Sequence, residues 1–306
     1  MTIHTLSSAL DSDSPAPLAH LPGRDDQPAP PEALDREAAR AAISAAAQRF
    51  TALLRETDDI ERLAAGTDWT VAETAAHVSC MFTAFSAVIV GERPALTPEQ
   101  YLDADFPTRL AAVNDATIAT VDHTDASQLA ELITVGAQRF LKLVASADPQ
   151  MECETPWYGA GRTRTPDCLT ALALSELTVH GHDITTGTGR PWPISAEHAK
   201  LIAGTLCPKM WPLVVRPEAG REAPVTYEVR LRGNGPRYVI RVADGTAEVR
   251  AAGGPVDCVI SADPATFLLV SYGRMPLSRA LLCGGMLAWG RRPWLGLRFK
   301  GLFFNP

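Results

Sequence analysis

The hydrophobic period of the sequence changes near residues 217–223. Upstream of this point apolar residues recur every three or four positions, which is the spacing of a helix face. Downstream they alternate with polar residues in the two-residue period of a strand, as in Val225, Tyr227, Val229 and Leu231. Pro217 and several charged residues between the two patterns are typical of a linker. The sequence therefore predicts a helical domain over 33–216 and an α+β domain over 224–306.

The helical part carries clear helix starts. Thr70 and Glu73 have the spacing of a capping box, in which each side chain accepts a hydrogen bond from a backbone N–H at the helix start. Thr165 followed by Pro166 is a second start signal, because proline suits the first helical position. Helices are expected over residues 33–56, 70–90, 107–121, 125–146, 165–187 and 195–215. Short connections between five or six helices indicate an antiparallel bundle.

The second part alternates strands with turn signals. Gly233, Asn234 and Gly235 form one such signal between two apolar runs. Strands are expected over residues 225–231, 238–242, 246–250 and 257–261, followed by helices over 263–272 and 276–289. Residues 1–32 are rich in proline and poor in core-forming patterns, so we expect a disordered or extended tail there.

Composition excludes several classes of protein. The net charge of −7 argues against a nucleic-acid binder, which normally shows a basic face. The chain has no run of 18 apolar residues and no basic segment followed by an apolar one at its start, so we expect no membrane contact and no secretory signal. Its six cysteines form no C-x-x-C pair. Reduced thiols in the cytoplasm are the expected setting.

One helix places ionisable groups where a core face is expected. Five residues follow at steps of three or four, namely Leu169, Leu172, Glu176, His180 and Asp183. Burying the three ionisable groups is costly unless they are paired or bind a metal. His77, beside an apolar stripe of the 70–90 helix, is the candidate third ligand. Two histidines and one glutamate leave an open position on a tetrahedral ion, as in catalytic zinc sites, although nickel, iron and cobalt accept the same donors.

Other interpretations of these residues stay open. Glu176 and His180 can equally form an ion pair on the surface of an amphipathic helix. Cys80 lies one turn beyond His77 and could serve as a ligand, but a buried inert thiol is the simpler interpretation. His182 is rotated far from His180 around the helix, and His123 and His198 belong to no such pattern.

Two segments resemble a known family. The segment from Asp68 to His77 and the segment from Ser175 to Asp183 are similar to signatures of mycothiol-dependent maleylpyruvate isomerases and their DinB-like relatives. The resemblance implies a DinB-like helical bundle with His77, Glu176 and His180 as metal ligands, and a functional acidic residue at Asp183. The region after residue 224 resembles a sterol-carrier-protein-like module, and its Tyr272, Gly273 and Arg274 match a conserved turn, which makes Arg274 a candidate catalytic residue.

The resemblance also implies a chemistry. The co-substrate would be mycothiol, whose thiolate adds to an electrophilic small molecule with the help of a divalent metal, zinc being expected. Elimination after addition gives a cis–trans isomerase of maleylpyruvate, whereas a stable adduct gives a thiol transferase. Because maleylpyruvate is a dianion, arginines are expected near the metal, and the candidates are Arg162, Arg164, Arg190 and Arg274. Trp157 and Tyr158 are expected either to shape the pocket or to fill the core.

Two alternatives to the thiol-dependent enzyme remain. One is a small-ligand binding module that uses the sterol-carrier-like domain, and the other is a biosynthetic enzyme that uses the scaffold without a thiol. Arg291 and Arg292 stand where the family often has an aspartate, which puts the usual substrate in doubt. The sequence leaves the oligomeric state open.

Overall fold

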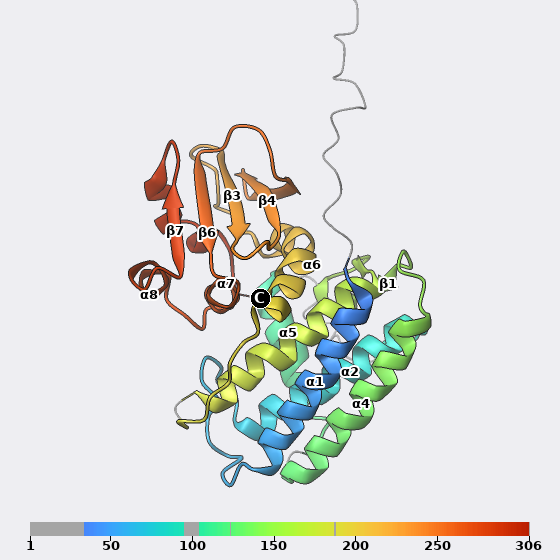
Figure 1. The fold of residues 1–306 in the computed structure, drawn as a ribbon. Helices are drawn as coiled ribbons and strands as arrows, with labels where there is room; N and C mark the ends of the chain where they lie inside the picture. The colour runs from blue at the N-terminus through green and yellow to red at the C-terminus, as the bar shows by residue number, and fades with distance from the viewer. Residues whose placement is uncertain (1–33, 95–103, 123, 187, 306) are drawn as a thin grey trace, which may run out of the picture.

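The structure is a computed structural model that describes residues 34–94, 104–122, 124–186 and 188–305. The predicted tail over residues 1–32 and His123 lie outside the described residues. Helices form the first part of the chain, and a sheet with further helices forms the second, as Figure 1 shows. This arrangement confirms the predicted fold class, a helical bundle followed by a small α+β part.

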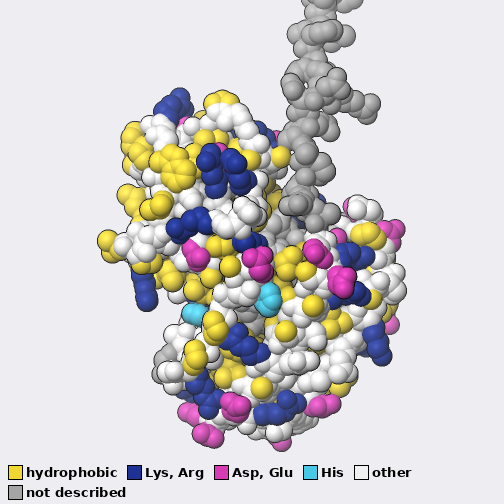
Figure 2. All heavy atoms as spheres, in the orientation of Figure 1, with side chains coloured by type: hydrophobic (Ala, Val, Ile, Leu, Met, Phe, Trp, Pro, Cys, Tyr) yellow, Lys and Arg dark blue, Asp and Glu magenta, His cyan; other side chains and the backbone are white. Residues whose placement is uncertain are grey.

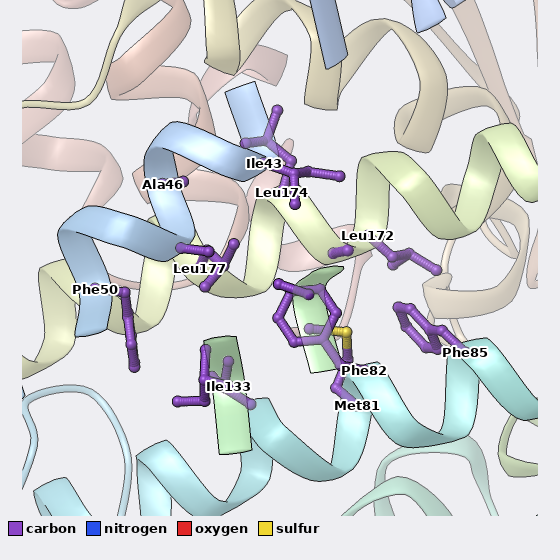
Figure 3. Close-up of a cluster of buried hydrophobic side chains, with 14 of the residues drawn as sticks. Ile43, Ala46, Phe50, Met81, Phe82, Phe85, Ile133, Leu172, Leu174 and Leu177 are labelled. Atoms are coloured by element: carbon purple, nitrogen blue, oxygen red, sulfur yellow. The ribbon is translucent and has the colours of Figure 1, made fainter. Parts of the chain in front are cut away.

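Four long helices build the bundle. They are α1 (Arg36–Arg55), α2 (Val71–Ile89), α4 (Ala126–Ser146) and α5 (Pro166–Thr185). Helix α1 packs against α4 and α5, and α2 packs against the same two helices. Their core consists of side chains fully removed from solvent, among them Ile43, Phe50, Phe82, Ile133, Leu174 and Leu177 (Figure 3). Two more helices flank the bundle, α3 (Phe106–Ile118) and α6 (Ala196–Val214).

The helix starts agree with the expected capping. The backbone N–H of Thr70 donates to Glu73 Oε2 at 2.7 Å, and the N–H of Glu73 donates to Thr70 Oγ1 at 3.1 Å. Helix α2 is long and apolar enough to cross a membrane by length and composition, but 72% of its apolar window is buried inside the structure. Its apolar character is therefore explained by its place in the bundle core.

The sheet has five strands in the order β5-β4-β3-β6-β7. The strands are β3 (Val225–Leu231), β4 (Arg237–Ala243), β5 (Thr246–Ala251), β6 (Cys258–Ala262) and β7 (Met286–Trp289). Strands β3 and β6 run parallel, and the other neighbours are antiparallel. Helix α7 (Pro264–Ser271) follows β6, and α8 (Leu277–Leu282) precedes β7. The space-filling view shows apolar side chains and basic residues beside one another on this part of the surface (Figure 2).

The predicted helix over residues 276–289 is correct as far as Leu282 and wrong beyond it. Helix α8 ends at Leu282, and residues 286–289 form β7, which pairs with β6. Gly284 adopts a φ of +69°, a conformation that ends helices because side chains other than glycine rarely tolerate it. At Gly285 a Cβ atom would lie 2.7 Å from Thr266, so the chain can pass this point only without a side chain.

Helix α6 contributes to both hydrophobic cores. Ile202, Leu206 and Met210 pack into the bundle core, whereas Cys207 and Trp211 pack into the core of the sheet. The Trp211 ring lies 5.8 Å from that of Phe267 and 5.6 Å from that of Phe303. The helix thus joins the two parts of the chain along its whole length.

Glu228 lies on the face of β3 that points away from Tyr227 and Val229, and it is held by two arginines. Arg230 donates to both of its carboxylate oxygens at 2.8 Å, and Arg237 donates to Oε1 at 2.7 Å. Burial raises the pKa of Glu228, but the hydrogen bonds from Arg230 and Arg237 outweigh it and hold the pKa below its usual range. The folded state therefore favours the carboxylate form of Glu228.

We expect Glu228→Gln to lower the free energy of unfolding by about 1–2 kcal/mol at pH 7, because it removes charge-assisted hydrogen bonds from a buried position. A group whose pKa is lowered by folding stabilises above its unfolded pKa and loses that effect as the pH falls. The difference between variant and parent should therefore shrink below about pH 4. Denaturant titrations at several pH values measure it, with the exposed Glu248→Gln as control. Equal stability of parent and Glu228→Gln at pH 7 would contradict the prediction.

Candidate metal centre

The predicted metal ligands converge in the structure. Glu176 Oε2 lies 3.1 Å from His77 Nε2 and 3.0 Å from His180 Nε2. The three ligand atoms all lie within 4.8 Å of one another. His180 is buried, and the side chains of His77 and Glu176 are only slightly exposed. The burial of His180 and the presence of His77 in the cluster argue against the surface ion pair that the sequence alone left open.

Two helices of the bundle position the cluster. Glu176 and His180 lie on consecutive turns of α5, four residues apart, so both side chains leave the same face. His77 projects from α2, which packs against α5. Trp69, which precedes the capping Thr70, has its ring 4.9 Å from that of His77. This contact could not be predicted from the sequence, because it depends on how the loop before α2 folds over the helix.

Asp183 and Arg274 meet behind His180. Asp183 Oδ2 lies 3.1 Å from His180 Nδ1, and the Asp183 side chain is fully buried. Arg274 donates from Nε to Oδ1 at 3.0 Å and from Nη2 to Oδ2 at 2.8 Å. The two predicted catalytic residues are therefore one bidentate ion pair, which links the helix carrying the cluster to the turn after α7. Such forked pairs are among the stronger charged contacts in proteins.

The electrostatics favour a charged network. Burial raises the pKa of Glu176, but hydrogen bonds with His180 and His77 outweigh it and hold the pKa well below its usual range. Burial lowers the pKa of His180, but hydrogen bonds with Asp183 and Glu176 raise it to about 9. Burial raises the pKa of Asp183, but hydrogen bonds with His180, His182 and Arg274 outweigh it and hold the pKa well below its usual range. The network therefore places anionic carboxylates on both sides of the His180 ring.

The donor set fits a divalent cation. With a metal bound, Asp183 would accept the hydrogen on His180 Nδ1, and Nε2 of that ring, which lies 3.0 Å from Glu176 Oε2 in this structure, would face the ion. Nε2 of His77 faces the same Glu176 oxygen, so two imidazole nitrogens and one carboxylate oxygen point to a common place. Nitrogen and oxygen donors of this kind suit zinc and its neighbours among the transition metals.

A cavity of about 650 Å³ opens beside the cluster. Its walls come from both parts of the chain and include Trp157, Tyr158, Leu172, Trp211, Phe267 and Phe299. Trp157 and Tyr158, expected either in the pocket or in the core, are buried and also line this cavity. Arg274 reaches the cavity as well, whereas Asp183 does not line it. The cavity is thus an apolar space with a charged site in its wall.

The other candidate residues are not part of the ligand cluster. Cys80 lines the cavity, but its thiol contacts Thr117 O at 3.4 Å, and burial raises its pKa. Arg164 stacks over the Tyr158 ring, and Arg190 contacts Glu56 at the surface. His182, Arg162 and His198 are outside the cluster of ligand atoms. Arg291 and Arg292 contact Asp257 in the sheet region, so their positive charge does not face the cavity.

Comparisons with known proteins find a family match within the helical part and two solved structures of similar fold. Residues 66–185 match the family described as the mycothiol maleylpyruvate isomerase N-terminal domain. Two solved structures, one titled as the mycothiol-dependent maleylpyruvate isomerase and one as a histidine-to-alanine mutant of it, align with a TM-score of 0.52. In each case the sequence identity is 17%, and the alignment covers 83% of this chain and 93% of the chain in the solved structure. A comparison with curated proteins finds no match.

The two kinds of comparison support each other. The solved structures share the fold of this chain over most of its length, and the matched segment contains all three residues of the cluster. It also contains Asp183, but not Arg274, which belongs to the second part of the chain. Residues 66–185 therefore belong to the mycothiol maleylpyruvate isomerase family, as the resemblance in the sequence predicts.

Proposed function

We propose that this protein is a metal- and mycothiol-dependent enzyme that adds a thiolate to an electrophilic small molecule. The observation that carries the proposal is the convergence of His77, Glu176 and His180 in the wall of a large apolar cavity. The match of residues 66–185 to a family named for a mycothiol isomerase supports mycothiol as the thiol. Six free cysteines fit a reducing compartment, and we place the enzyme in the cytoplasm.

His77, Glu176 and His180 would hold the metal, with zinc as the expected ion. When bound, such an ion keeps a thiol deprotonated at neutral pH and so supplies a strong nucleophile. The chain's own residues prepare the site for it. Glu176 is held in its anionic form, and Asp183 fixes the orientation of the His180 ring.

We assign different roles to Asp183 and Arg274. Asp183 does not reach the cavity, so we propose that it positions His180 rather than contacting substrate. Arg274 lines the cavity, and its bonds to Asp183 and to Tyr272 O leave further N–H groups of the guanidinium for other acceptors. We propose that these groups contact an anionic part of the substrate beside the metal.

The fate of the adduct defines the reaction. A thiolate that adds to the cis double bond of maleylpyruvate forms a carbon–sulfur bond and a single carbon–carbon bond, about which rotation is free. Loss of the thiolate then restores the double bond in the trans form, with no net change in atoms. In a transferase the carbon–sulfur bond persists and a proton adds to the neighbouring carbon. Both reactions need the same site.

We expect the purified protein to consume maleylpyruvate only when mycothiol and a divalent metal are both present. Mass spectrometry of the reaction separates the two fates, since isomerisation leaves the mass unchanged and transfer adds the mass of the thiol. Either product supports thiolate addition. Consumption without thiol would instead favour a biosynthetic reaction on the same scaffold. Binding without any consumption of electrophiles would favour the small-ligand binding module.

We expect His77→Ala to lose bound metal and to lower thiol-dependent turnover by at least a hundredfold, because it removes one of three ligands. Elemental analysis of the purified variant measures the metal directly. The matched control is His198→Ala on α6, a histidine outside the cluster, which should keep both metal and turnover. Full metal content in His77→Ala would remove the basis of the proposal.

We expect Asp183→Asn to weaken metal affinity by about 10–100-fold, because it loosens the hydrogen bond that orients His180. Competition with a chromophoric chelator measures the affinity without any need for turnover. A structural role alone would lower stability and leave the affinity of the folded fraction unchanged. Unchanged affinity would therefore contradict the positioning role.

A further inference from the structure

Lys300 lies in the wall of the cavity without an acidic partner. It begins the short helix η5 (Lys300–Leu302) near the C-terminal end of the described chain. Its ammonium group is half-buried and donates to Phe304 O at 3.4 Å. Among the described residues, no carboxylate lies within ion-pair distance of it. Neither the metal centre nor the comparisons with known proteins account for this residue.

Backbone contacts fix the segment that carries Lys300. Val215 and Phe303 form a β-bridge, and the N–H of Phe304 donates to Val214 O at 2.7 Å. The N–H of Arg216 donates to Leu302 O at 2.9 Å. The segment is thus tied to the end of α6, the helix that serves both cores. The position of the Lys300 backbone at the cavity is therefore set by the fold.

Within the part of the chain that the structure describes, no acidic side chain compensates the charge of Lys300. Arg216 lies close by, with its guanidinium 4.4 Å above the Phe304 ring. Burial lowers the pKa of Lys300 to about 8, and the positive charge of Arg216 adds to this effect. Of the acidic residues that line the cavity, Asp68 and Asp115 are exposed, and Glu176 is engaged by the two histidines. A half-buried ammonium beside a second cation is costly unless an anion approaches it.

The surroundings of Lys300 are apolar. The cavity wall next to it in the chain is built by Phe299 and Phe303, and the rings of Trp211 and Phe267 complete this side. A ligand that fills this space buries hydrocarbon or aromatic surface there, which is favourable in proportion to its area. One charged group among apolar walls is typical of sites that bind and orient an amphipathic ligand.

We propose that Lys300 binds a carboxylate of the substrate, and that the substrate has an apolar body which lies along the aromatic wall of the cavity. This would place one carboxylate of the substrate at the C-terminal segment, while the reacting end, with the anionic part that we assign to Arg274, faces the metal ligands. That the ligand is the substrate rests on the proposed function. The binding of an amphipathic carboxylate at Lys300 does not depend on it.

A matched pair of fluorescent probes tests this site. The probes are 11-(dansylamino)undecanoate and its methyl ester, which share the apolar body and differ in charge. We expect Lys300→Met, in the full chain, to weaken binding of the acid about tenfold and to leave the ester within twofold, since only the acid can pair with the ammonium. Lys300→Arg keeps the charge and should retain most of the affinity. Lys142→Met, at an exposed position on α4, should change neither probe.

The comparison of Lys300→Met with Lys300→Arg distinguishes a lost charge from lost packing. Equal weakening of acid and ester by Lys300→Met would show lost packing and overturn the proposal, as would unchanged binding of the acid. Failure of Lys300→Arg to restore the acid would overturn it too. The titration uses protein treated with chelator and contains no thiol. A negative result in the turnover test would therefore not affect the conclusion from the probe titration. A negative probe titration would likewise not affect the conclusion from the turnover test.

Discussion

The ion pair between Asp183 and Arg274 is the contact on which the rest of the site depends. The carboxylate is fully buried on α5, and the arginine comes from the turn after α7, 91 residues later. A buried carboxylate would be unstable alone, so it needs both Arg274 and His180 to remain ionised. The same contact therefore orients a predicted metal ligand and joins the bundle to the α+β part. Loss of either partner would leave the other charge buried without compensation.

The site combines two kinds of environment that are usually separate. The metal ligands and Asp183 form a compact polar network, whose members satisfy one another through hydrogen bonds. The cavity beside it is lined mainly by aromatic and aliphatic side chains, several of them from α6 and the C-terminal segment. Reaction at the boundary of such an environment benefits from low local dielectric, because charges there interact strongly. The bundle supplies the charged groups, and the second part of the chain supplies much of the apolar wall.

Local signals in the sequence predicted what depends on neighbouring residues. The capping of α2 by Thr70 and Glu73 was predictable because both partners lie within one turn. Glu176 and His180 were predictable as a pair because helix geometry fixes residues four apart on one face. His77 could be predicted as the third ligand only by assuming that its helix packs against the helix of Glu176 and His180. The pairing of Asp183 with Arg274 could not be derived from spacing, since only the tertiary fold brings them together.

Errors and omissions arose where distant contacts override local preference. The apolar run of β7 extends the pattern of α8, and only its pairing with β6 and the glycines before it make it a strand. Lys300 and Trp69 gave no signal, because each gains its place from packing against another segment. The shared role of α6 was equally hidden, since its apolar residues surround most of the helix and do not say which core each one enters.

The anchoring of the C-terminal segment to α6 has a consequence for how the protein matures on the ribosome. His77, Glu176 and His180 are all synthesised more than 100 residues before Phe303 and Phe304. These three residues can thus come together while the apolar space beside them still lacks one wall. Only when the later residues pair with Val214 and Val215 is that wall completed. Order of synthesis would then let a metal ion of the kind proposed above reach these residues before the aromatic wall at the C-terminal segment is in place.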